Sequence, residues 1–256
     1  MARRKLSARQ RALIINRLQT RGERAWFREL RRFFRVYTIT LSNAVKEGGR
    51  DTVDTHQDQF GIDLTAVLRR LYRNSINVMR DQIYADFRHV SGKTALEVFE
   101  QFIIEWIDVY TAEKVKALSS AYFGDIKSVM EESFREGLGQ EQTARAIRER
   151  VGTEYAQWKA ARIARTENHV ASEIGTREAV KSLGVDTVKE WSAAEDLRTR
   201  PTHVAADGQI RELDEPFDVG NFKLMQPGDV TGPPEEIINC RCVALYHPRI
   251  DGEIIR

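Results

Sequence analysis

The chain has 256 residues, of which 41% are hydrophobic and 30% are charged. That composition is typical of a soluble protein with enough apolar side chains for one large core or two modest ones. Apolar runs of about 18 residues are missing, and the basic N-terminus lacks the apolar core of a secretory signal. We therefore expect neither a membrane-spanning nor a secreted protein, but one of the cytoplasm or of a particle assembled there.

The net charge of +2 is unevenly distributed along the chain. Residues 1–36 hold twelve Lys or Arg against two Glu, a net charge of +10, so the remainder carries −8. This asymmetry indicates a terminus that meets a polyanion or an acidic partner, although a solvated basic helix face has the same composition. The residues that we assign to a nucleic-acid contact are Arg3, Arg4, Lys5, Arg9, Arg11, Arg17, Arg21 and Arg24.

Apolar side chains at helical spacing predict long helices in the first half of the chain, over residues 8–46, about 63–87 and about 94–120. The first of these places an apolar, aromatic stripe among arginines. Such a helix could pack against another subunit, lie on nucleic acid or lie on a membrane surface. Catalytic motifs are lacking in this half, and we assign residues 1–120 as a helical attachment region.

The second half begins with predicted helices at residues 125–135 and 141–151, followed by a long helix over 155–183. Gly184 closes that helix in a position that favours left-handed backbone. Within it, Glu167 shares a face with Ile163 and Val170, so its carboxylate points toward the core. A buried carboxylate requires a charge partner, a hydrogen-bond network or a metal, and we prefer an ion pair to arginine over catalysis.

The stretch from Trp191 onward carries most of the residues capable of metal or acid–base chemistry. Its pattern predicts a strand at 186–191, a short helix at 197–206 that Pro201 interrupts, and a turn at Asp207 and Gly208. Alternating apolar residues predict a closing strand over residues 237–247. The fold expected is therefore α+β, with a long-helix first half and, over residues 121–256, a compact module of helices and a small antiparallel sheet.

The two cysteines, Cys240 and Cys242, are too close in sequence for a comfortable disulfide. On a strand, alternation places both thiols on one side, which suits two ligands of a tetrahedral zinc or two reduced side chains in a small core. His203 and His247 are the residues we expect to complete such a zinc site.

Two further interpretations of this stretch stay open. A metal-dependent hydrolase or nuclease would use His203 and Asp207 with the cysteines. Alternatively, the same polar groups could hold an irregular loop in place, with Asp196 against Arg198 or Arg200, because loop backbone needs hydrogen-bond partners.

Together these residues form an ordered set of motifs: I-A-R-T-E, then W-x4-D-x-R-x-R-x2-H-x3-D-G, then I-N-C-R-C. The set resembles the Mu F-like minor head protein family of tailed bacteriophages over about residues 125–247. The positions that carry the resemblance are Arg165, Thr166, Glu167, Trp191, Asp196, Arg198, Arg200, His203, Gly208, Asn239, Cys240, Arg241 and Cys242.

The resemblance implies a minor capsid protein without enzymatic activity, bound at the portal vertex inside the head and assembled in the host cytoplasm. Its implied work is head assembly, genome packaging or DNA delivery. The implied partners are the portal protein, other capsid components and packaged double-stranded DNA. Some members carry a toxin or enzyme domain after the C-x-C strand; nine residues follow His247 here, so we expect none. Catalytic residues do not carry over, and the expected cofactor is none or a structural zinc ion.

Overall fold

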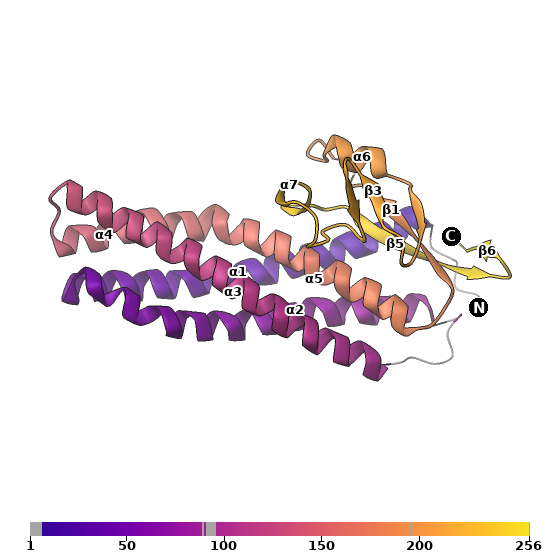
Figure 1. Ribbon diagram of the computed structural model, residues 1–256, viewed down its shortest axis with the longest axis horizontal. Coiled ribbons are helices and arrows are strands. Elements are labelled where there is room, and N and C mark those ends of the chain that lie inside the picture. Colours follow the sequence, from indigo (N-terminus) through magenta and orange to yellow (C-terminus); the bar gives the residue numbers. More distant parts are fainter. Residues whose placement is uncertain (1–6, 89, 91–95, 195, 256) are drawn as a thin grey trace. The chain divides into compact units, whose positions relative to one another are not determined.

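The structure is a computed structural model that describes residues 7–88, 90, 96–194 and 196–255. It confirms the α+β fold, with long helices before a small antiparallel sheet (Figure 1). The long helices are α1 (Ala8–Gly48), α2 (Gln57–Asp86), α3 (Leu96–Arg135), α4 (Gln140–Glu154) and α5 (Ala160–Ser182). Short turns η1 (Arg50–Thr52) and η2 (Asp54–His56) join α1 to α2, and a π-helical turn, η3 (Tyr155–Lys159), joins α4 to α5. Within the described residues, none of the helices is long and apolar enough to cross a membrane.

The described chain forms two compact units, each assembled from separate stretches. Unit 1 comprises Met1–Arg24, Tyr72–Ile104 and Arg165–Arg256, and unit 2 comprises Ala25–Leu71 and Glu105–Ala164. These units do not coincide with the division at residue 120 expected from the sequence. The reason is that helices α1, α2, α3 and α5 each contribute residues to both units.

Unit 2 has an aromatic core. Phe60 and Tyr122 stack with ring centroids 5.0 Å apart, and the hydroxyls of Tyr122 and Thr38 are hydrogen-bonded at 2.8 Å. The other rings of the cluster are Phe33, Phe34, Tyr37, Phe123 and Tyr155. This core explains why α3 continues to Arg135 where the sequence predicted a break near residue 120: packing of Tyr122 outweighs the weak helix propensity of Gly124.

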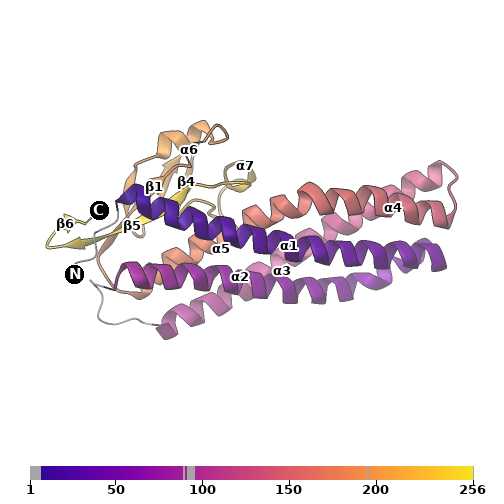
Figure 2. The same ribbon diagram turned by 180° about the vertical axis from the view of Figure 1, so that it is seen from behind.

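Unit 1 contains a four-stranded antiparallel sheet in the order β2-β1-β5-β6. Its strands are β1 (Thr187–Ser192), β2 (Ile210–Glu212), β5 (Val243–Ile250) and β6 (Glu253–Ile254). A separate hairpin, β3 (Phe217–Val219) and β4 (Phe222–Leu224), and the short helices α6 (Pro201–Ala206) and α7 (Pro234–Ile237) complete the module. Figure 2 shows the first turns of α1 beside β5, where Val243 and Leu245 pack against Ala12 and Ile15.

The closing strand begins later than the sequence predicted. Residues 234–237 form α7 instead, and Asn239 has a φ of 60°, a left-handed conformation that cannot continue a strand. The strand therefore starts at Val243, after both cysteines. Helix α6 likewise begins at Pro201 rather than breaking there, because proline is well suited to the first position of a helix.

A buried carboxylate ties α1, α5 and β5 together within unit 1. Glu173 on α5 accepts hydrogen bonds from the Gln19 side chain at 2.8 Å and from the Ala244 backbone N–H at 3.1 Å. It is only 1% exposed, and burial raises its pKa to about 8. Near neutral pH the carboxyl is therefore largely protonated.

Replacing Glu173 by Gln should change how stability depends on pH. A carboxyl whose pKa rises from 4.5 to about 8 on folding makes the folded chain bind more protons than the unfolded chain between those values. The free energy of unfolding of the wild type should therefore fall by a few kcal/mol, relative to Glu173→Gln, as the pH rises from 4.5 to 8. Urea unfolding at several pH values measures this difference, and parallel curves for the two proteins would contradict it.

Two helical glycines provide a matched pair for testing the packing. A Cβ atom at Gly175 of α5 would lie 2.8 Å from the Ile76 backbone of α2, whereas one at Gly124 of α3 would meet nothing within 4 Å. Gly175→Ala should lower the free energy of unfolding by about 1–3 kcal/mol, because the backbones must separate. Gly124→Ala should raise it by up to about 1 kcal/mol through helix propensity. Equal effects of the two substitutions in urea unfolding would show that the two helices do not approach closely.

Candidate metal centre

The site is built around a turn at residues 238–242, here called the cysteine turn. At its centre, Asn239 adopts the left-handed conformation and accepts a hydrogen bond from Arg165 at 3.1 Å. The backbone N–H of Asn239 donates to the Thr166 hydroxyl at 3.2 Å. Arg165 and Thr166 are consecutive residues of α5, so one turn of a rigid helix fixes both sides of Asn239.

Two further motif residues hold the flanks of the cysteine turn. Arg200, the residue before α6, donates to the carbonyl of Ile238 at 2.5 Å. Asp196 forms an ion pair with Arg241 at 2.8 Å and also accepts from the backbone N–H of Arg198 at 2.9 Å. The sequence had suggested the Arg198 or Arg200 side chain as the partner of Asp196. The structure assigns that role to Arg241.

The cysteine turn brings Cys240 and Cys242 against His203 of α6. Nδ1 of His203 lies 3.3 Å from the Cys242 sulfur and 3.6 Å from the Cys240 sulfur. All three ligand atoms lie within 4.8 Å of one another, and all three side chains are buried. These are three of the four residues that the sequence predicted as zinc ligands.

The ring of His203 is held on its other edge by an acidic side chain that the sequence did not single out. Nε2 of His203 lies 2.9 Å from a carboxylate oxygen of Glu236 on α7, and the same oxygen accepts a hydrogen bond from Thr202. A proton on Nε2 leaves the Nδ1 lone pair directed at the sulfurs. Trp191 closes the site, with its ring edge-on to His203 at 5.3 Å between centroids.

The pKa values of the two neighbouring thiols shift in opposite directions. The hydrogen bond from the Cys240 thiol lowers the pKa of Cys242, while the same shared hydrogen bond, with burial, raises the pKa of Cys240. The thiolate is therefore concentrated on Cys242. A thiolate beside an imidazole lone pair is a donor set that soft and borderline metal ions prefer.

His169 of α5 lies near this group, although the sequence pattern gave it little weight. It is 3% exposed, and neither ring nitrogen has a hydrogen-bond partner among the described residues. Burial, and then the proximity of His203, lowers its pKa to about 3, so the ring is neutral at physiological pH. His169 and Cys240 line the same cavity of about 210 Å³, together with the polar side chains Gln19, Glu23, Arg165, Asn168, Asp196 and Arg241.

The fourth predicted ligand, His247, lies elsewhere. Its ring nitrogens lie 2.7 Å from Arg11 and 2.9 Å from Glu190. It shares a face of β5 with Val243 and Leu245, which pack against α1, the helix that carries Arg11. Asp207 is also outside the group: it accepts a hydrogen bond from the backbone N–H of Ala193 at 2.7 Å. This placement does not favour the hydrolase or nuclease that would use His203 with Asp207.

Glu167 is buried, as the sequence predicted, and accepts a hydrogen bond from the Tyr72 hydroxyl at 2.8 Å. Among the predicted nucleic-acid contacts, Arg9, Arg17, Arg21 and Arg24 are exposed. Arg11 is not: it donates to the Tyr246 carbonyl at 2.9 Å and holds His247. Arg3, Arg4 and Lys5 lie outside the described residues.

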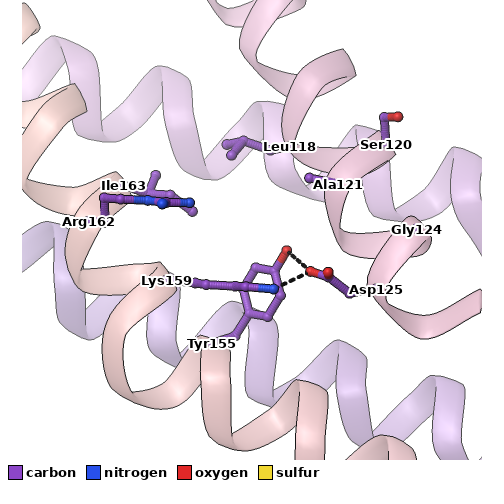
Figure 3. A pocket seen from close by; sticks show the side chains of 9 residues that line it. All are labelled: Leu118, Ser120, Ala121, Gly124, Asp125, Tyr155, Lys159, Arg162 and Ile163. Atoms are coloured by element: carbon purple, nitrogen blue, oxygen red, sulfur yellow. Dashed lines mark hydrogen bonds and ion pairs between the residues drawn. The ribbon is translucent and has the colours of Figure 1, made fainter. Parts of the chain in front are cut away.

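A second cavity, of about 380 Å³, lies within unit 2. Figure 3 shows Lys159 and Tyr155, from the π-helical turn, converging on Asp125 of α3. Lys159 lies 2.5 Å from Asp125 and 2.7 Å from Glu154. Asp125 and Lys159 are thus paired with each other, which indicates a structural contact between the π-helical turn and α3.

The motif residues lie in a stretch that matches a known protein family. Residues 124–245 match the family model described as "Phage Mu protein F like protein". This stretch is a Phage Mu protein F-like region. It contains the RTE residues of α5, the Asp196–Arg241 pair, His203 and both cysteines, so the candidate metal centre lies inside the Mu F-like region.

Two curated proteins are similar to part of this chain. "Minor head protein GP7" of Bacillus phage SPP1 is 36% identical over 125 residues, which cover 46% of this chain and 38% of that protein. "NAD(+)--arginine ADP-ribosyltransferase EFV" of Enterococcus faecalis (strain ATCC 700802 / V583) is 35% identical over 113 residues, 43% of this chain and 23% of that protein. The chain thus spans well under half the length of either relative. None of the solved structures searched matches significantly.

Substitutions at Asn239 test whether the turn depends on both its conformation and its side chain. Asn239→Ala loses the Arg165 contact and places a residue with a Cβ in the left-handed region, whereas Asn239→Gly loses only the contact. Asn239→Ala should therefore lower the free energy of unfolding by about 1–2 kcal/mol more than Asn239→Gly does. Urea unfolding of both variants measures the difference; equal losses would mean that the left-handed conformation imposes no cost.

Proposed function

We propose that this protein is a minor head protein of a tailed phage or prophage, attached at the portal vertex inside the head. Its role is structural, in head assembly, genome packaging or DNA delivery, rather than enzymatic. The observation that carries the proposal is the 36% identity over 125 residues to a protein named as a minor head protein. In the region that matches the family model, motif side chains hold one another, as expected for a structural module.

The relative named as a transferase does not favour an enzymatic role here. Its match covers only 23% of that protein, so most of the length of the named transferase lies outside the match. The groups gathered in the Mu F-like region bond to one another: Arg165 to Asn239, Asp196 to Arg241, and His203 to Glu236. Such closed pairs suit a stable scaffold.

Exposed arginines on α1 support a contact with packaged DNA. Arg17, Arg21 and Arg24 follow one another at spacings of four and three residues, which places them on one face of the helix. With Leu13, Asn16 and Thr20 they line an open depression of about 320 Å³. Guanidinium groups in such a row can bind successive phosphates without regard to base sequence.

Replacing these three arginines by glutamine should weaken DNA binding and reduce its salt dependence. If each arginine contacts one phosphate, the slope of log K against log salt should become shallower by up to about 2.7. Filter binding of the full chain to double-stranded DNA at several salt concentrations measures both quantities. The matched control is the triple change of Lys116, Arg135 and Arg145 to glutamine, which removes the same charge from other exposed positions. If both triple variants lost the same DNA affinity, binding would depend on the overall charge of the chain and not on these three arginines.

Attachment at the portal is tested by co-expressing the full chain with the portal protein and with the major capsid protein of the same particle. We expect co-purification with the portal protein, and a cryo-electron microscopy map of intact heads should show density for the chain on the inner side of the portal vertex. Association with the major capsid protein alone, or density on the outer shell, would contradict the proposed location.

A further inference from the structure

The spacing of the three ligand atoms already fits a metal ion. A tetrahedral zinc with bonds of about 2.3 Å to sulfur and about 2.0–2.1 Å to nitrogen separates a sulfur from a nitrogen ligand by about 3.5 Å. The observed separations from Nδ1 of His203 are 3.3 Å to Cys242 and 3.6 Å to Cys240. Both sulfur–nitrogen separations therefore fit a zinc tetrahedron, and the two sulfurs lie within 4.8 Å of each other.

The side chain behind His203 has the arrangement expected for a metal ligand. Histidines that bind metals with one nitrogen usually direct the other nitrogen at a carboxylate, which fixes the ring and its tautomer. Glu236 occupies that position at 2.9 Å from Nε2, and Thr202 in turn holds the carboxylate at 2.9 Å. Nδ1, on the other edge of the ring, faces the thiols.

His169 provides the independent observation. A buried imidazole normally satisfies at least one nitrogen by hydrogen bonding, because an unpaired buried polar group is costly. Both nitrogens of His169 lack a hydrogen-bond partner among the described residues, and the ring lines the cavity that Cys240 also lines. A Cβ at Gly228 would lie 2.8 Å from the ring, so the loop that carries Gly228 packs closely against its other side.

We propose that His169, His203, Cys240 and Cys242 bind one zinc ion, with Glu236 orienting His203 from outside the coordination sphere. His169 lies outside the group of three whose ligand atoms are within 4.8 Å of one another. Metal binding therefore draws its side chain toward the thiols, and the cavity of about 210 Å³ provides the room for this movement.

Two thiolates and two imidazoles form a donor set that selects zinc over magnesium or calcium, which prefer oxygen ligands. With four protein ligands the coordination sphere is closed, as in structural zinc sites. The ion would link α5, α6 and the cysteine turn, three segments of unit 1. The ligands that they contribute, His169, His203 and Cys240, are more than thirty residues apart in sequence. Its role is to fasten the Mu F-like region.

The first test uses the full-length wild type, purified and kept under a thiol-specific reductant. Elemental analysis should find about one zinc per chain. X-ray absorption should find two sulfur neighbours at about 2.3 Å and two imidazole nitrogens at about 2.0–2.1 Å. As a check, zinc is added to protein whose thiols are shown to be reduced, and the excess is removed. Less than about a tenth of an equivalent of bound zinc per chain would then overturn the proposal. Two sulfurs with a single imidazole would overturn the role of His169.

Variants then distinguish the residues that bind zinc directly from Glu236, which orients a ligand. In competition with a chromogenic chelator, His169→Ala and His203→Ala should each weaken zinc binding by more than the roughly 10–100-fold loss expected for Glu236→Gln, which alters only the outer shell. His56→Ala, at a histidine of unit 2 hydrogen-bonded to Thr52, is the control and should bind as the wild type does. Wild-type affinity in His169→Ala would contradict the four-ligand site.

These outcomes are distinct from failure of the proposed head function. Zinc content and coordination are measured on the isolated chain and do not depend on portal or DNA binding. If His169→Ala does not fold, the count of imidazole neighbours in the wild type still decides the ligand set.

Discussion

The left-handed turn at Asn239 is the constraint on which the rest of the module depends. Because the backbone reverses there, the following two cysteines leave the line of the strand and face His203 instead of continuing the sheet. Arg165 and Thr166 hold this turn from α5, Arg200 holds it from the residue before α6, and Asp196 holds its Arg241. The motif positions, scattered over nearly eighty residues of sequence, thus serve one local structure.

This arrangement also accounts for the concentration of reactive side chains in the C-terminal part of the chain. Asp196 is paired with Arg241 and Glu236 with His203, so these charges are matched inside the module. The two thiols, His203 and His169 gather beside them. Because thiols and imidazoles are metal ligands, the chemistry of the module points to fastening rather than catalysis, which agrees with a role in a virion.

Much of this could be predicted from the sequence, and the failures have physical causes. Apolar periodicity located the helices, and alternation located β1 and most of β5, since burial of one face dictates both patterns. The predicted start of β5 was wrong because the conformation of Asn239 is imposed by partners on α5 that are distant in sequence. His247 was grouped with the cysteines by composition, although strand alternation turns it toward Arg11. Spacing along α5 could have indicated His169, which lies three residues after Thr166 and four before Glu173, on one face of the helix.

The central claim is that the family motif residues act by holding the cysteine turn. A double-mutant cycle between Arg165 and Asn239, measured by urea unfolding of the two single variants to alanine and the double variant, tests it most directly. We expect a coupling energy of about 1–2 kcal/mol, because a charged donor and a partly buried side chain of the turn share one hydrogen bond. A coupling energy near zero would mean that the two residues act independently and that the turn is held by something else.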